Sequence, residues 1–180
     1  MMPASQKNQK SAAQALPLVA IILPVLLALL FVGVELSERS MRQTLLADAL
    51  RQATRAGVQR FDYRAFAQNR SQIASEPGHQ HTGCSNLISG SAREHACAVL
   101  LANLRTISNL SSSPEQLAEQ VVWQIFPDGG TCQHGQQIIA SSSQPLVCAA
   151  ATLTLQGAGL YGPPWQATII AADTLDPLNE

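Results

Sequence analysis

The chain has 180 residues, of which 46% are hydrophobic, and a net charge of −1; this length suits one small folded domain besides any anchoring segment. The charge is unevenly spread, since from residue 60 onward five Arg stand against nine Asp and Glu, and no Lys follows Lys10. This acidic balance argues against nucleic acid or anionic lipid headgroups as partners of the C-terminal part. The sequence contains no G-x-S-x-G motif and no phosphate-binding glycine-rich loop, so we predict no catalytic residue and no cofactor.

Residues 15–34 form an apolar run without one ionisable side chain. At 1.5 Å of rise per residue, a helix of this length covers about 30 Å, the thickness of a bilayer's hydrocarbon core. Lys7 and Lys10 precede the run and no acidic residue occurs before Glu35, so residues 1–14 are predicted to be a cytoplasmic tail. A secretory signal has an apolar centre of only about 7–15 residues and a small-x-small cleavage site. We therefore expect an uncleaved, single-pass anchor in contact with membrane lipid.

Two residues of this region have a possible functional role. Pro24 lies inside the run, and in lipid a proline kinks a helix instead of ending it. The kink is either a packing site for another subunit or a bend without a role. Glu35 ends the run. It is either a register contact with a neighbouring subunit, for instance with an Arg, or an ordinary interfacial charge.

The helical pattern continues beyond the apolar run. Residues 35–59 contain no proline, and their only glycine, Gly57, is placed to end a helix. Apolar side chains recur at helical spacing, and polar side chains cover the other face. The apolar set is Leu36, Leu45, Leu46, Ala49, Leu50, Ala53 and Ala56. We predict one continuous helix from the membrane to residue 59, whose apolar stripe packs either on its own domain or on neighbouring copies.

The sequence of residues 60–180 predicts an extracytoplasmic α+β domain whose first half is helical. A helical segment at 61–68 is followed by a long polar loop at 69–91. The next helix spans 92–110 and has one apolar face. The members of that face are Ala96, Val99, Leu100, Leu104 and Ile107. Ser113, with Pro at the first helical position and Gln three residues on, begins a short helix with a capping box.

The second half of the domain predicts a small antiparallel sheet. Val121–Phe126 alternates as a strand does, and the turn residues Pro-Asp-Gly-Gly follow it. Three further strands are predicted at 132–140, 147–156 and 166–172. The Gly- and Pro-rich stretch 157–164 is predicted to form an exposed loop. One sheet face is expected to pack on the helix 92–110 through Leu153, Leu155, Ile169 and Ile170.

Three aromatic residues bear on function. Trp123 lies in the alternating strand, and we assign it to the core. Tyr161 and Trp165 flank a Gly-Pro-Pro turn. They are the candidates for an exposed contact surface.

All four cysteines follow the apolar run: Cys84, Cys97, Cys132 and Cys148. An even number in an oxidising compartment indicates two disulfides, for which three connectivities exist. The sequence-local pairing, Cys84–Cys97 and Cys132–Cys148, is favoured because it closes short loops. Each loop of about 15 residues contributes roughly 3 kcal/mol.

Metal binding is the competing interpretation of the same region. Each of the four histidines lies within five residues of a cysteine, and His79 and His81 are the best candidate ligands. However, no Cys-x-x-Cys or His-x-x-x-His pair occurs, and an oxidised cysteine cannot serve as a thiolate ligand. We therefore predict no metal site.

Residues 12–58 resemble the opening of TadE/TadG-like proteins, minor pilus components of the bacterial tight-adherence (Flp) system. Pro24 within the apolar segment, then Phe31, Gly33 and the acidic Glu35, match the family pattern in order. The small-residue helix of the pattern is matched by Ala49, Ala53, Arg55, Ala56 and Gly57. The resemblance implies a long N-terminal transmembrane helix that leads into a pilin-like domain, and a role in pilus assembly through contacts with other pilus subunits.

The resemblance also bears on processing and location. Processed members carry Glu-Phe near the start of the apolar helix, where this chain has Leu18 and Val19, so the uncleaved, TadG-like variety is favoured. The candidates for subunit contacts are Pro24, Glu35, Ala49, Ala53, Tyr161 and Trp165. The expected location is the bacterial inner membrane, with a periplasmic C-terminal domain, or a surface pilus. The alternative is a bitopic extracytoplasmic protein that binds a ligand or metal and has no part in a pilus.

Overall fold

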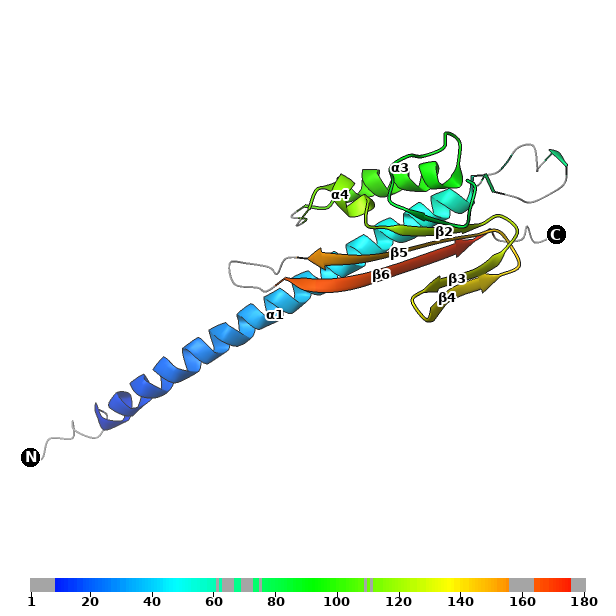
Figure 1. The fold of residues 1–180 in the computed structure, drawn as a ribbon. Coiled ribbons are helices and arrows are strands. Elements are labelled where there is room, and N and C mark those ends of the chain that lie inside the picture. Colours follow the sequence, from blue (N-terminus) through cyan, green and yellow to red (C-terminus); the bar gives the residue numbers. More distant parts are fainter. Residues whose placement is uncertain are drawn as a thin grey trace, which may run out of the picture.

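The computed structural model describes residues 9–60, 62, 67–68, 73–74, 76–108, 110, 112–155 and 164–175, with side chains from residue 19 onward. A long N-terminal helix leads into a small domain of helices and antiparallel strands, which confirms the α+β fold class (Figure 1). The elements in chain order are α1 (Gln9–Val58), β1 (Gln80–Thr82), α3 (Ala92–Leu104), α4 (Pro114–Ala118), β2 (Val122–Phe126), β3 (Gly130–His134), β4 (Gln137–Ser142), β5 (Leu146–Leu155) and β6 (Trp165–Thr174).

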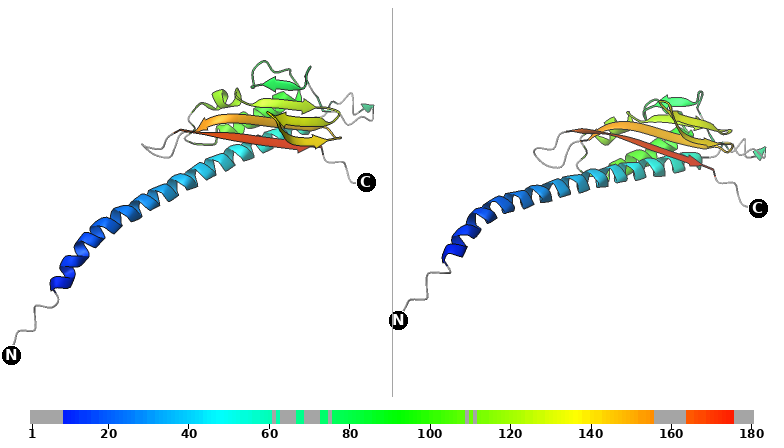
Figure 2. Two further views of the ribbon diagram at one scale, coloured as in Figure 1. Left: turned by 60° about the horizontal axis from the view of Figure 1, so that its bottom comes forward. Right: turned by 90° about the horizontal axis from the view of Figure 1, so that it is seen from below.

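α1 is one unbroken helix of 50 residues, as the continuous helical pattern predicts. Its N-terminal half projects away from the domain, and its C-terminal half lies along the sheet (Figure 1). Figure 2 shows that α1 curves, with the bend in its blue N-terminal part. That part carries Pro17 and Pro24, which lack the amide hydrogen needed for the helical ladder. The bend is therefore present in the chain alone, without any partner.

The main sheet has four strands in the order β1-β2-β5-β6, and each neighbouring pair is antiparallel. β5 and β6 have ten residues each and pair along their whole length, from Leu146 opposite Thr174 to Leu155 opposite Trp165. β1 has only three residues. The loop predicted at 157–164 lies outside the described residues except for Pro164.

The prediction of a single strand at 132–140 is wrong, because this stretch forms the hairpin β3–β4. The two strands close on the pair His134 and Gln137. Gly135 between them has a φ of +61°, which a tight hairpin turn requires and which glycine adopts at little cost. The polar, strand-like residues on both sides concealed the turn in the sequence.

The core lies between the sheet and two helices, α1 and α3, both on one sheet face. Trp123 is fully buried, as predicted. The expected packing partner of the sheet needs correction, because β5 and β6 are covered mainly by α1 and not by α3. Ile169 is buried there, but Ile170 is only half-buried, since adjacent residues of a strand point to opposite faces.

The two shorter helices are fixed by their N-terminal caps. Ser91 caps α3 by accepting a hydrogen bond from the Glu94 amide. Ser113 and Gln116 form the predicted capping box of α4. α3 ends at Leu104, six residues before the predicted end.

Candidate membrane and assembly interface

The N-terminal half of α1 is an exposed apolar surface. Every residue from 19 to 34 is exposed, and Phe31 keeps 73% of its surface accessible. The best 18-residue window has a mean hydropathy of 2.8, and none of it is buried within the chain. The helix is long and apolar enough to cross a membrane, a property that membrane anchors share with signal sequences. Pro24 lies on this surface, and it is not among the described residues that build the core or pack against it.

Charged residues mark the end of the apolar surface. Arg39 lies 2.8 Å from Glu35 Oε1, and Arg42 lies 3.4 Å from Glu38 Oε2, both one helical turn apart. Such pairs contribute only about 0.3–0.5 kcal/mol each. Their consequence is that Glu35 already has a cationic partner within its own helix.

Trp165 lies at the same level as this boundary, at the start of β6. The Arg39 guanidinium sits 5.9 Å from the centre of its indole ring, a cation–π contact. Trp165 is half-buried, and its Nε1 has no hydrogen-bond acceptor among the described residues. The predicted contact residue is therefore partly covered by its own chain. Tyr161 lies outside the described residues.

Ala49 and Ala53 lie inside the domain and not on its surface, at 3% and 0% exposure. Their side chains are part of the core cluster shared with α3 and the sheet. Of the two alternatives for the stripe on residues 35–59, packing on its own domain is the one found for these two positions. We do not retain them as subunit-contact candidates.

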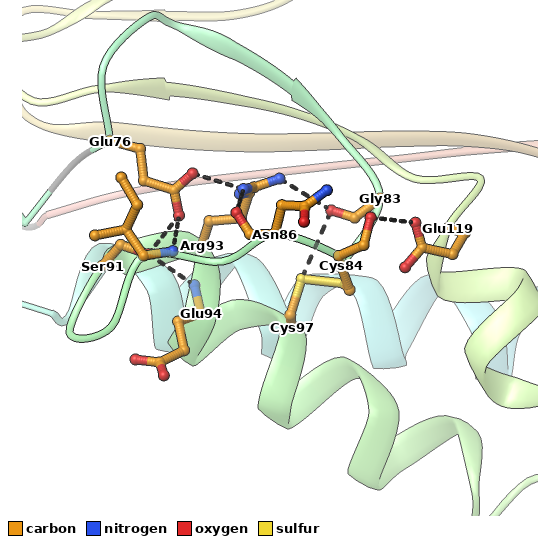
Figure 3. Close-up of a disulfide and its surroundings, with 11 residues drawn as sticks. Glu76, Gly83, Cys84, Asn86, Ser91, Arg93, Glu94, Cys97 and Glu119 are labelled. Atoms are coloured by element: carbon orange, nitrogen blue, oxygen red, sulfur yellow. Dashed lines mark hydrogen bonds and ion pairs between the residues drawn. A yellow bond between two sulfur atoms is a disulfide. The ribbon is translucent and has the colours of Figure 1, made fainter.

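A buried ion pair holds the loop before α3 (Figure 3). Arg93 Nη2 lies 2.7 Å from Glu76 Oε2, and both side chains are almost fully buried. The other carboxylate oxygen of Glu76 accepts hydrogen bonds from Ser91 Oγ at 2.7 Å and from the Ile88 amide at 3.2 Å. Burial raises the pKa of Glu76, but these donors and the charge of Arg93 outweigh burial, so the pKa lies below its ordinary value.

The disulfide Cys84–Cys97 fixes the same loop to α3 (Figure 3). Arg93 also donates to the carbonyl of Gly83 at 3.4 Å. Gly83 has a φ of +73°, and a Cβ there would collide with the carboxylate of Glu119. The loop is therefore held to α3 by a buried ion pair and a disulfide, and its backbone at Gly83 lies close against Glu119.

The disulfide Cys132–Cys148 joins the hairpin β3–β4 to β5. Both cysteines are buried in a second small cluster with Leu146, against which Phe126 and Ile139 pack. The two disulfides are those of the favoured sequence-local pairing, and the structure contains no free cysteine among the described residues, which include all four.

The two histidines proposed as ligands have other contacts. The His79 ring stacks on Phe126 with centroids 5.2 Å apart, and its Nδ1 lies 3.3 Å from the Ile125 carbonyl oxygen. His81 Nε2 lies 3.3 Å from the Gly78 carbonyl oxygen, and its Nδ1 faces Glu76 at 3.7 Å. Over the part of the chain that the structure describes, no three His, Cys, Asp or Glu side chains gather as a metal site would need.

Glu76 and Arg93 were missed by the sequence analysis. The available signal was that Arg93 is the only Lys or Arg between Arg70 and Arg105, and that it stands in the first turn of the predicted helix, where a cation is unfavourable unless it is paired. A lone cation in such a helix indicates a buried partner. Nothing in the sequence identified Glu76 as that partner.

Comparisons with protein-family models, curated proteins and solved structures give no match to this chain.

Proposed function

We propose that the chain is a membrane-anchored subunit of a bacterial envelope assembly, with residues 15–34 of α1 in the inner membrane and the disulfide-bonded domain in the periplasm. The observation that carries this proposal is the continuity of α1. Its exposed apolar half passes without a break into residues that build the core, including Leu46 and Leu50. A signal sequence is cut away from the domain it delivers, whereas here the apolar run and the core-building residues belong to one unbroken helix, which supports an anchor that stays attached.

The two disulfides and the flanking charges support this compartment. Disulfides persist in oxidising compartments, and Lys7 and Lys10 favour a cytoplasmic N-terminus. Together they support an inner-membrane protein with its domain outside.

The proposed assembly is a tight-adherence pilus, in which the chain acts as a minor pilin or assembly component through subunit contacts. The resemblance of residues 12–58 to TadE/TadG-like proteins supports this, and so does the order of a long helix followed by an antiparallel sheet. Since Glu35 is paired with Arg39, we assign the contacts within the membrane to the apolar surface around Pro24.

Topology is the first test. Envelopes of the native bacterium are extracted with alkaline carbonate, and spheroplasts are treated with protease. We expect the chain to stay in the membrane pellet and its domain to be cut from the outside. Recovery in the soluble fraction, or protection of the domain in intact spheroplasts, would refute the anchor or its orientation.

Intact mass and co-purification test the finer proposal. The mass of the native chain should include residues 1–34, and all four cysteines should become alkylated only after reduction. Gently solubilised membranes should yield the chain together with tight-adherence pilin subunits. A chain that is anchored and oxidised but purifies without any pilus subunit would retain the anchor and refute the pilus.

A further inference from the structure

The two edges of the main sheet differ in how well they are protected from pairing. β1 forms one edge with three residues, between Pro77 and the positive-φ residue Gly83. Over the part of the chain that the structure describes, β6 forms the other edge, with ten residues in unbroken register on β5. Exposed edges normally carry Lys, Pro or a bulge that prevents further pairing. β6 has none of these, and its only charged residue is Asp173.

A groove runs along the C-terminal half of this edge. It has a volume of about 530 Å³ and is lined by residues 170–173 of β6, by Arg51 and Arg55 of α1, and by Ile139 of β4. Ala171 of β6 packs in the core with α1, and Ala172 packs in the cluster with Ile139, so α1 and β4 cover opposite faces of β6. Because the groove is lined by α1, by β4 and by four consecutive residues of β6, it lies along the edge of that strand.

The two arginines that line the groove favour a negatively charged partner. The Arg55 side chain makes no hydrogen bond or ion pair within the described residues, and the Arg51 side chain pairs only with Asp48 there, at 3.3 Å in an exposed pair. Asp173 is engaged in an interaction of its own. Two arginines beside an open edge are notable because the remainder of the domain is acidic, with five Arg against nine Asp and Glu from residue 60 onward.

We propose that the edge of β6 binds an extended acidic segment of a partner protein by strand addition. The segment forms backbone hydrogen bonds with residues 170–173, and a carboxylate on its α1-facing side pairs with Arg55. Its alternate side chains face Ile139 on the other side, because successive residues of a strand point to opposite faces. This binding does not require that α1 lies in a membrane.

A second copy of the chain does not fit this edge if both copies share one membrane. β6 runs in the same direction as α1, away from the exposed apolar half (Figure 1). Antiparallel pairing of two β6 strands would therefore point the two apolar halves in opposite directions. In any other orientation, β6 of a second copy would still offer only one acidic side chain, Asp173, to Arg51 and Arg55. We therefore take the occupant to be a segment of a different protein.

The test uses the oxidised full-length chain in lipid nanodiscs and a fluorescent eight-residue peptide of alternating Glu and Val, whose carboxylates all lie on one face. Fluorescence anisotropy reports binding. We expect the peptide with Lys in place of Glu to bind at least tenfold more weakly. We expect Arg55→Glu to weaken binding of the Glu peptide at least tenfold. Arg105→Glu, on an exposed arginine of the α3–α4 side, is the matched control and should leave binding unchanged.

Two N-methylated forms of the peptide test strand addition itself. Methylation of every Val amide blocks one edge of the peptide strand, and methylation of every Glu amide blocks the other, so one form should bind and the other should not. Equal binding of both forms, no binding of the parent peptide, or an unchanged affinity in Arg55→Glu would overturn the proposal. A chain that is dimeric alone and becomes monomeric with peptide would assign the edge to a second copy and would also overturn it.

Discussion

The two halves of α1 are parts of one helix with opposite surroundings. Residues 19–34 are apolar on all sides and touch nothing in the core, whereas the half from Leu46 to Val58 is apolar on one side and buries that side in the domain. A helix that is apolar all round needs an apolar environment, and an amphipathic helix needs only one covered face. The distribution of polar residues around the helix, and not its total hydrophobicity, distinguishes the exposed half from the half that builds the core.

The two glycines of α1 show the same contrast. A Cβ at Gly57 would lie 3.2 Å from the Cβ of Ala96 and 3.3 Å from the Ala92 carbonyl oxygen, so the glycine allows α3 to approach closely. At Gly33 a Cβ would meet nothing within 4 Å. The packing need of the second half is met inside the chain, and that of the first half is left for lipid or a partner.

Charging the exposed half should have the largest effect and should leave the domain folded. In Leu26→Asp/Leu30→Asp, each carboxylate costs about 2.5–3.5 kcal/mol of insertion free energy at a helix centre. We expect the protein to leave the carbonate-washed membrane pellet, while the purified variant, refolded under oxidising conditions, still forms both disulfides of its domain. The control Gln43→Asp/Thr44→Asp adds the same charges at exposed positions of α1 beyond the apolar run and should stay in the pellet. Retention of the doubly charged variant would contradict the assignment of the anchor.

The ion pair Glu76–Arg93 places charge inside the domain, whereas residues 19–34 of α1 carry no charge. Glu76→Ala leaves the buried Arg93 without its partner, and we expect a loss of about 3–5 kcal/mol in the free energy of unfolding. Urea unfolding followed by the fluorescence of the buried Trp123 measures this. Glu115→Ala removes one partner of the exposed pair with Arg105 and should cause no measurable loss. Similar losses in both variants would show that burial of the pair is not what matters.

The same pair should make stability depend on pH. Because the pKa of Glu76 is lowered on folding from an ordinary value of 4.5, its contribution is fully present above that value. It is lost as the pH falls through the lower folded-state pKa. The free energy of unfolding should therefore decrease below about pH 4.5, and less steeply in Glu76→Gln than in the natural chain. Parallel pH profiles for the two proteins would contradict this origin.

Truncating one leucine in each half of α1 compares the halves directly. Leu50 is 3% exposed and Leu29 is 63% exposed. We expect Leu50→Ala to reduce the free energy of unfolding by about 2–5 kcal/mol, because it leaves a cavity against α3 and the sheet. Leu29→Ala should change it by less than about 0.5 kcal/mol. A measurable loss in Leu29→Ala in detergent would mean that the exposed half also packs on the domain.

Helical and strand periodicity was sufficient to predict most of the fold. The stripe containing Ala49 and Ala53 predicted a continuing amphipathic helix, and the alternation around Trp123 predicted a buried strand. Two features depended on tertiary contacts and were not predicted correctly. The hairpin turn at Gly135 carries only one glycine as a signal, and the cover of β5 and β6 by α1 depends on how the helix returns along the sheet.

The candidate interface was less predictable because it depends on what is left uncovered. The pattern could not decide whether Ala49 and Ala53 meet the chain's own domain or another subunit, since both surroundings are apolar. Trp165 was predicted to be exposed from its Gly- and Pro-rich neighbours, but the cation that covers it, Arg39, lies more than a hundred residues earlier. The open edge of β6 became visible only with the strand order.

Glu35 should have the smallest effect on the chain by itself, and this is what makes it informative. In Glu35→Gln the half-buried pair with Arg39 within the helix is lost, which costs about 0.3–0.5 kcal/mol, while Arg39 keeps its contact with Trp165. Arg39→Gln loses both contacts, and a cation–π contact at an exposed site adds about 0.5–1 kcal/mol. Urea unfolding in detergent should therefore rank Arg39→Gln below Glu35→Gln, with both close to the natural chain. If Glu35 also served as a register contact between subunits, Glu35→Gln would show the same small loss in unfolding and would in addition sharply reduce co-purification with pilus subunits. Unfolding and co-purification together distinguish a Glu35 that only forms an ion pair within its own helix from a Glu35 that also binds a neighbouring subunit.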